Sequence, residues 1–495
     1  MAKKKRGLKE EYNLLTRDLD WEPSYVPFEE MYPYVSFEGI KIHNWDRWED
    51  PFRVTVENYV RIQAEKERKF HAIRENIDMM QSQLDLTDAR WLEAMKLFAG
   101  VAFNGEYNAH RLFQYVSRHV PIPAIRFAAF TQSVDELRHV QNEVLLFNNY
   151  NKYFQGFHSW KKVSHRHWLM SVIKSFFEDA MTAGPFEGLA AIAFGFEVAF
   201  TNILFVTMGS TAMANNDLCY TAVGFTNQSD ESRHMTLGMM AIRAMLEEDP
   251  DNAPIVQKWL DKWFWRSYRA FTAIAYILDY VAPKKVVSWK EAFEMYIEDQ
   301  VLNGLFKDLE MFGIRKPLYY EQAIIEKDRI SHQAALILHR VSHVAFFHTF
   351  APTAEDQVWL EEKYGDTWRD VWAKKWEQQT DPNYERNYPG LPMLCQTCQY
   401  PMVFAEPEDI HKTAYRHSEY EGETYHFCSD GCKTIFDDEP DKYKEAWIPA
   451  HEILSGNCGP AEDLLNYWGI DPEDGGDYYE STDYKNFEKW KKMRA

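Results

Sequence analysis

Two segments of this chain repeat one pattern of residues, Asp135-Glu-Leu-Arg-His139 and Asp230-Glu-Ser-Arg-His234. In each segment the glutamate and the histidine are three residues apart, which places their side chains on the same face of a helix. Both segments lie in apolar sequence of helical period, so we expect each pair to point into a core. Such a pair can direct a carboxylate and an imidazole at one metal ion. The four candidate ligands are Glu136, His139, Glu231 and His234.

A single glutamate precedes each segment within another apolar stretch. Glu106 lies 30 residues before Glu136, and Glu197 lies 34 residues before Glu231. Glu197 is surrounded by alanine, isoleucine, valine and phenylalanine, where an unpaired carboxylate would cost several kcal/mol or stay protonated. The two halves of this region therefore resemble one helix-pair motif that is used twice.

Together these residues supply four carboxylates and two imidazoles, the ligand set of ferritin-like di-iron and di-manganese helix bundles. Carboxylates can bridge two metals, and one imidazole per metal leaves positions open for O2. Asp135 and Asp230 are expected to accept the second ring N–H of the histidines. Arg138 and Arg233 are expected to neutralise these aspartates. The alternative is a set of buried ion pairs that only holds the helices together, but the doubled spacing favours the metal site.

Four cysteines near the end of the chain form two short-spaced pairs, Cys395-x-x-Cys398 and Cys428-x-x-x-Cys432. Two such pairs on separate turns suit a closed tetrahedral Zn²⁺ site, which is structural because it leaves no position for a substrate. Six cysteines in 495 residues do not make a disulfide framework, and in a cytosolic protein they indicate metal. The alternative is a set of four unligated thiols.

The repeat lies within a long region of helical pattern in which little of the sequence alternates with period two. We therefore predict an all-α fold, a ferritin-like di-iron helix bundle with extra helices, plus a small C-terminal zinc-binding α+β module. Long helices are expected near 87–116, 123–149, 165–182, 185–208, 217–248, 253–281, 289–311 and 320–350. The expected regions are an N-terminal arm with a leading helix (1–80), the bundle (81–350), a helical linker (351–390), the four-cysteine zinc module (391–445) and a C-terminal tail (446–495).

Composition narrows the class of partner. The formal net charge of −21 disfavours binding to nucleic acid or to an anionic membrane surface. The most apolar stretch, 189–214, is long enough to span a bilayer, but Glu197 and Asn202 interrupt it, which favours a buried core helix. No apolar run follows the basic residues 1–6, which argues against a signal peptide. A cytoplasmic protein is expected.

Further stretches of sequence point to a known family. Together with the six ligands and the cysteine pairs, the chain resembles the catalytic α subunit of bacterial multicomponent di-iron monooxygenases, closest to the phenol hydroxylase and toluene monooxygenase group. The cysteines are similar to those of the phenol hydroxylase branch, and 425–443 is similar to a small YHS-type metal-binding module. The stretches that carry the resemblance include Leu15-Thr-Arg-Asp-Leu-Asp-Trp-Glu, Phe37-Glu-Gly-Ile-Lys-Ile, Thr182-Ala-Gly-Pro-Phe-Glu, Trp263-Phe-Trp-Arg and Tyr425-His-Phe-Cys-Ser-Asp-Gly-Cys.

The resemblance implies a role for each site residue. One iron would be bound by Glu106, Glu136 and His139, and the other by Glu197, Glu231 and His234, with at least one bridging carboxylate. Thr201, Asn202 and Gln228 would lie on the O2 and gating side. Thr201 would relay a proton, the alternative being a hydroxyl that bonds only to its own helix. The substrate pocket would be lined by Ala102, Gly105, Ala109, Phe176 and Phe196, for which ordinary core packing is the alternative.

The resemblance also implies an activity, namely O2-dependent hydroxylation of phenol or a methylphenol to a catechol at two iron ions (Fe²⁺/Fe³⁺). The chain has no glycine-rich dinucleotide fingerprint, so electrons would come from NADH through a separate ferredoxin-type reductase with FAD and 2Fe-2S. Other implied partners are β and γ subunits, in a dimer of heterotrimers, and a small regulatory protein. Alternatives are oxidation of toluene, benzene, an alkene, a short alkane or a sulfide, or, outside this class, an iron-storage ferroxidase or a radical-generating reductase subunit.

Overall fold

The computed structural model of the chain describes residues 7–17, 23–79, 86–150, 166–340, 351–383 and 393–446, together with single residues and pairs of the C-terminal tail. Within these ranges the fold is almost entirely helical, which confirms the predicted all-α class. Most of the predicted tail, 446–495, and the last ten residues of the helix expected over 320–350 lie outside the described residues.

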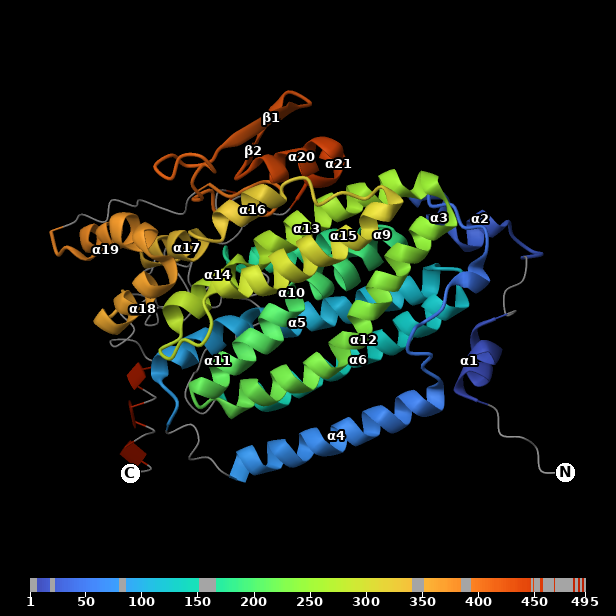
Figure 1. Ribbon diagram of the computed structural model, residues 1–495, viewed down its shortest axis with the longest axis horizontal. Coiled ribbons are helices and arrows are strands. Elements are labelled where there is room, and N and C mark those ends of the chain that lie inside the picture. The colour runs from blue at the N-terminus through green and yellow to red at the C-terminus, as the bar shows by residue number, and fades with distance from the viewer. Residues whose placement is uncertain are drawn as a thin grey trace.

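Long helices form the centre of the molecule (Figure 1). Asp88 and Asp217 begin two of them by accepting hydrogen bonds from amides of the first turn. Pro123 begins another, at a position where its missing N–H has no helical partner. The long helices are α5 (Ala89–His119), α6 (Pro123–Phe147), α8 (Ser171–Met181), α12 (Leu218–Glu248) and α13 (Ala253–Tyr276).

One further core helix is interrupted by two π-helical segments. It consists of α9 (Pro185–Leu189), a π-helix (Ala190–Val198), α10 (Ala199–Asn202), a second π-helix (Ile203–Thr207) and α11 (Met208–Ala214). Among the described residues it is the one helix long and apolar enough to cross a membrane, but 72% of its most apolar window is buried inside the protein. It is therefore the buried core helix that its sequence predicted. Such π-helical insertions are often found at functional sites, and Glu197 lies in the first of them.

Smaller elements surround the bundle. The helix expected over 320–350 is divided into α16 and α17, and the one expected over 165–182 begins only at Ser171. The surrounding α-helices are α1 (Leu8–Thr16), α2 (Phe28–Met31), α3 (Pro33–Glu38), α4 (Val56–Met79), α14 (Trp289–Ala292), α15 (Phe306–Leu309), α16 (Tyr320–Glu326), α17 (Ile330–Arg340), α18 (Ala354–Tyr364) and α19 (Ala373–Thr380). Additional π-helices cover Ile277–Val281, Phe293–Leu305 and Trp368–Trp372, and 3-10 turns cover Trp45–Arg47, Pro250–Asn252 and Glu310–Phe312.

The cysteine-bearing segment forms a small α+β unit, as predicted. Its two strands, β1 (Arg416–Tyr420) and β2 (Glu423–Phe427), pair antiparallel, with His417 opposite His426. Two short helices follow, α20 (Asp430–Asp438) and α21 (Pro440–Tyr443). Figure 1 shows this unit and α4 on opposite sides of the bundle. The bundle is thus covered by a polar helix on one side and by the cysteine module on the other.

Candidate functional site

Four helices bring the six candidate ligands together at the centre of the bundle. Five of the six residues are buried, and the side chain of the sixth, Glu106, is 14% exposed. The ligand atoms of five of them form two overlapping groups that share Glu136, namely Glu106 with Glu136 and His139, and Glu136 with Glu231 and His234. Glu106 comes from α5, Glu136 and His139 from α6, Glu197 from the first π-helix, and Glu231 and His234 from α12.

Two glutamates lie between the two histidines. The two oxygens of Glu136 are 3.3 Å from Nδ1 of His139 and 3.1 Å from Nδ1 of His234. Those of Glu231 are 3.5 Å and 3.4 Å from the same two nitrogens. Each carboxylate therefore reaches both imidazoles with different oxygens, as a carboxylate that bridges two metals must.

Each of the remaining two glutamates approaches one histidine. Glu106 is 3.5 Å from Nδ1 of His139, and Glu197 is 3.7 Å from Nδ1 of His234. Donor atoms that bind one metal at about 2.1 Å and at right angles lie about 3 Å apart. The observed separations are close to this value, so the cluster divides into two sets of donors, one around each histidine.

The second ring nitrogen of each histidine faces an aspartate of the other helix. Nε2 of His139 lies 3.4 Å from Asp230, and Nε2 of His234 lies 3.3 Å from Asp135. An Nε2–H that donates to a carboxylate leaves Nδ1 unprotonated and turned toward the glutamates. The two expected acceptors are thus beside the histidines, but the pairing crosses between α6 and α12.

Cations and neutral hydrogen-bond donors surround these aspartates. Nη1 of Arg138 is 3.2 Å from both Asp135 and Asp230, and Arg233 pairs with Asp135.

The outer helix α4 also contacts both aspartates. Gln63 donates to Asp135 at 2.7 Å and to Asp230 at 3.0 Å. Tyr59 and Lys66 of the same helix also reach these carboxylates, at 2.8 Å and 2.5 Å. The outer helix α4 therefore helps to hold both histidines.

The buried acids crowd one another. Burial raises the pKa of Glu136 and of Glu231 well above the usual range, and the charge of a neighbouring glutamate raises each further. Burial and the charge of Glu106 raise the pKa of Glu197 to about 8. The Nδ1 atoms of His139 and His234 and one oxygen of Glu136 are buried and have no hydrogen-bond partner in the described part of the chain. Crowded acids and unpartnered ligand atoms fit a centre that holds two divalent cations.

Sequence reasoning missed two polar residues beside the ligands. Gln132, one helical turn before Glu136, donates to both oxygens of Glu197, at 3.0 Å and 3.2 Å. Glu143, one turn after His139, is fully buried, and its two oxygens have no hydrogen-bond partner among the described residues. Their spacing on α6 is the signal that was available for both, since residues four apart share a helical face.

An apolar cavity borders the carboxylates. Glu106, Glu136, Glu197 and Glu231 all line it, as does the buried Thr201. The rest of its wall is almost entirely alanine, valine, isoleucine, leucine, methionine and phenylalanine. The four glutamates thus form a polar patch in the wall of an otherwise apolar space.

Four of the five predicted pocket residues line this cavity, namely Ala102, Gly105, Ala109 and Phe196. The fifth prediction is corrected, because the cavity is lined by Phe177 and not by Phe176. Successive residues of α8 point about 100° apart, and Phe176 packs behind the wall against Phe196 and Trp263, with ring centroids 5.2 Å and 5.7 Å away.

Asn202 and Gln228 lie together but apart from the cavity wall. The side chain of Gln228 donates to Asn202 at 3.0 Å, and both side chains are partly buried. This hydrogen bond links α10 with α12, the helices that follow Glu197 and carry Glu231.

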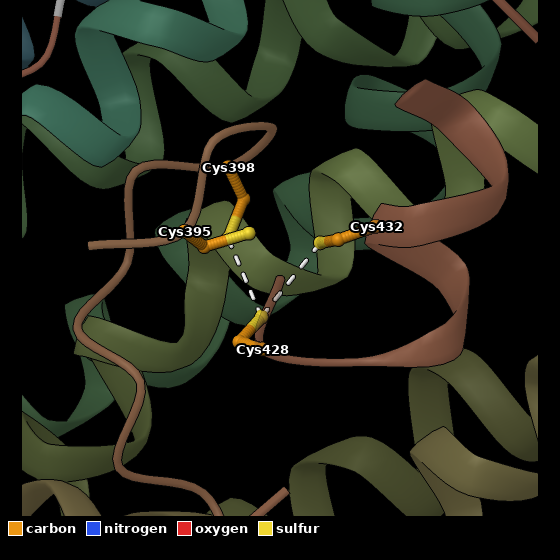
Figure 2. A group of neighbouring side chains, drawn as sticks. All are labelled: Cys395, Cys398, Cys428 and Cys432. Carbon is orange, nitrogen blue, oxygen red and sulfur yellow. Dashed lines mark hydrogen bonds between the residues drawn. The ribbon is translucent and has the colours of Figure 1, made fainter. Parts of the chain in front are cut away.

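The four cysteines converge as the sequence predicted (Figure 2). The sulfur of Cys428 lies 3.7 Å from those of Cys398 and Cys432, and all four thiols are buried. Disulfide sulfurs would be about 2 Å apart. Thiolates bound to one Zn²⁺ at about 2.3 Å in a tetrahedron lie about 3.8 Å apart. The geometry therefore fits a closed zinc site.

Comparisons with known proteins agree with this architecture. Residues 21–249 match the family described as methane/phenol/alkene hydroxylase, and residues 403–447 match the YHS domain, a range that includes Cys428 and Cys432 but begins after the first cysteine pair. The chain is 45% identical to the oxygenase component of phenol 2-monooxygenase from Pseudomonas sp. (strain CF600), over 100% of this chain and 96% of that protein.

Two further relatives are informative. The chain is 28% identical to the α subunit of the oxygenase component of the alkene monooxygenase system of Xanthobacter autotrophicus, over 93% of each protein. The crystal structure of xenon-pressurised phenol hydroxylase from Pseudomonas sp. OX1 superposes with a TM-score of 0.94 and 42% identity, covering 98% of this chain and 100% of that one.

Proposed function

This chain belongs to the methane, phenol and alkene hydroxylase family, and from that membership we propose that it is an oxygenase α subunit that hydroxylates phenol or a methylphenol to a catechol. The observation that carries the proposal is the position of the carboxylate and imidazole cluster in the wall of the apolar cavity. Among the described residues the four glutamates are the only acids in that wall, so a small aromatic molecule in the cavity would lie beside the metal centre.

The ligand assignment follows the geometry around each histidine. We propose that Glu106, Glu136 and His139 bind one iron, that Glu197, Glu231 and His234 bind the other, and that Glu136 or Glu231 bridges them. When bound, two irons would supply the reductive activation of O2. The protein contributes two imidazoles, oriented by Asp135 and Asp230, and a cavity whose wall is mostly apolar.

Thr201 is the proposed proton carrier of the cavity. It is buried, lines the cavity with Glu197 one helical turn away, and carries a hydroxyl that both donates and accepts. Asn202 and Gln228, which hydrogen-bond to each other, are proposed to act as a gate on the side of the centre where O2 would bind. The cysteine module is proposed to bind one structural Zn²⁺.

Electrons are proposed to come from NADH through a reductase with FAD and a 2Fe-2S cluster. In the described residues the one β-sheet consists of β1 and β2, which form no dinucleotide-binding fold.

Companion β and γ subunits in a dimer of heterotrimers and a small regulatory protein are also proposed. The outer face of α6 supports a protein partner, because Phe130, Leu137 and Val144, seven residues apart, are 54%, 45% and 45% exposed. A cytoplasmic location is proposed for the complex.

Phenol is preferred as substrate because the relatives named for phenol are 42–45% identical to this chain, against 28% for those named for alkenes and propane. The test is the chain reconstituted with iron, its partner proteins, NADH and O2, and offered phenol, toluene and propene. Catechol as the main product supports the proposal. Epoxide or benzyl alcohol as the main product would move the preference to another substrate of the same centre, whereas growth of a ferric core without hydroxylation would replace it with a ferroxidase.

A further inference from the structure

Tyr400 belongs to the cysteine module, yet it lines the cavity of the bundle. The other lining residues all fall between Phe98 and Ile277, in the helical bundle. Tyr400 is 4% exposed and is the module's single contribution to this wall among the described residues. Part of the wall of the proposed substrate cavity is therefore built by a second structural unit, the one that carries the four buried cysteines.

The backbone of Tyr400 is held by the first cysteine pair. Its N–H donates to the sulfur of Cys398 at 3.4 Å, and its carbonyl accepts from the amide of Cys395 at 2.9 Å. Gln399, between them, has a φ of +59° and donates to the carbonyl of Cys395 at 2.8 Å. The turn from Cys395 to Tyr400, with Gln399 in the left-handed region, brings the two thiols together and places Tyr400 at the cavity. The position of the Tyr400 ring therefore depends on the same backbone conformation that orients the thiols.

Hydrogen bonds from α8 and α13 hold the turn that carries Tyr400 against the bundle. Ser175 of α8 donates to the carbonyl of Cys398 at 3.4 Å, and Arg266 of α13 donates to that of Thr397 at 3.0 Å. The ring of Tyr400 packs on Phe404, with centroids 4.8 Å apart. Residues of α8 and α13 also line the cavity. The turn is therefore hydrogen-bonded to helices that form the same wall as Tyr400.

We propose that Tyr400 sets the size of aromatic substrate that the cavity accepts, and that the metal bound by Cys395, Cys398, Cys428 and Cys432 holds it in place. The substrate class rests on the proposed function, but the cavity and the turn do not. With the thiols joined by a metal, the turn is rigid and the ring closes this part of the wall. The zinc site thereby acts as a positioning device for substrate selection, in addition to stabilising the module.

Equilibrium binding to the resting hydroxylase tests the first half of the proposal without any turnover. Calorimetric titration with phenol and with 4-propylphenol gives the ratio of the two affinities. Tyr400→Ala should raise the relative affinity for 4-propylphenol roughly tenfold, the usual effect of removing a clash with a small apolar group. Tyr400→Phe, which keeps the ring, and Tyr415→Ala, an exposed tyrosine of the same module, should leave the ratio unchanged. An unchanged ratio in Tyr400→Ala overturns the assignment, whether or not the enzyme hydroxylates phenol.

The link to the metal is tested with Co²⁺ in the cysteine site, since its thiolate absorption bands respond to small changes at the sulfurs. Saturation with 4-propylphenol should shift these bands in the unsubstituted chain and in Tyr415→Ala, because the turn that binds the metal also carries the wall residue. The shift should be lost in Tyr400→Ala. Identical spectra with and without 4-propylphenol in the unsubstituted chain, or a shift that persists in Tyr400→Ala, would contradict the link.

Discussion

Nε2 of His139, on α6, lies 3.4 Å from the carboxylate of Asp230, on α12. The reciprocal pair joins His234 to Asp135. Each imidazole is thus oriented by the helix that carries the other one, so the two halves of the repeated motif cannot shift independently. Ligands on separate helices need such a constraint, because a metal site tolerates only small displacements of its ligands.

The first prediction concerns Gln63, which donates to both of these aspartates. Gln63→Leu should weaken iron binding about tenfold or more, because the outer hydrogen-bond partners of metal ligands typically matter by that factor. Iron content after dialysis and the Mössbauer spectrum of the diferric state measure the effect. Gln114→Leu, an exposed glutamine of α5, is the matched control. Unchanged iron content and spectrum in Gln63→Leu would show that the hydrogen bonds of Gln63 do not help to hold the iron ligands.

The second prediction concerns Glu231, which approaches both histidines. Glu231→Ala should abolish the iron pair and leave the zinc content unchanged, because the two sites share no residue. Metal analysis and the loss of magnetic coupling between the irons are the measurements. Retention of two coupled irons would mean that Glu231 is not a ligand.

The third prediction is the converse for the cysteine module. Cys432→Ser should remove zinc, since a closed four-sulfur site loses a ligand, while the iron pair in the bundle remains. Metal analysis decides this, and circular dichroism shows whether the helical bundle stays folded. Zinc content equal to that of the unsubstituted chain would rule out the four-cysteine site.

The fourth prediction concerns pH and His332, a buried residue of α17 that belongs to neither candidate metal cluster. Burial lowers its pKa from 6.5 to about 3, and its Nδ1 lies 2.6 Å from the hydroxyl of Tyr280. Below pH 6.5 the unfolded chain takes up a proton that the folded chain excludes, so the free energy of unfolding falls as the pH is lowered. Between pH 6.5, the pKa of this group in the unfolded chain, and about pH 5, protonation of His332 alone should lower the free energy of unfolding by about 2 kcal/mol.

Denaturant unfolding of the unsubstituted chain and of His332→Asn, each at neutral pH and at about pH 5, isolates this contribution. The two proteins share all other titrating groups. The variant should be less stable at neutral pH, through loss of packing, but its stability should fall less on acidification. A parallel fall in both proteins would show that His332 does not resist protonation.

The sequence predicted well which side chains gather inside the bundle, because the signal for them is local. Helical spacing places Glu136 with His139 and Glu231 with His234, and the apolar surroundings of Glu197 leave a buried carboxylate in need of a partner. The cysteine pairs are readable in the same way, since the turn between Cys395 and Cys398 is short. The expectations that held are those in which a few neighbouring residues define the chemistry.

Features that depend on packing between distant elements were not predicted. Gln63 reaches the aspartates only because α4 lies along α6 and α12, an arrangement that helical periodicity does not encode. Adjacent positions such as Phe176 and Phe177 are equally apolar, and only the rotation of α8 decides which one lines the cavity. Tyr400 is far from the bundle in sequence and enters its cavity through tertiary contacts alone.

We propose that this chain inserts one oxygen atom from O2 into phenol at the centre formed by Glu106, Glu136, His139, Glu197, Glu231 and His234. To test this, the iron-loaded hydroxylase, its partner proteins and NADH are supplied with isotopically labelled O2 and phenol, and the product is analysed by mass spectrometry. Catechol with one labelled oxygen atom is expected, and no catechol from Glu231→Ala. Catechol without label, or consumption of O2 with formation of ferric mineral and no catechol, would contradict it.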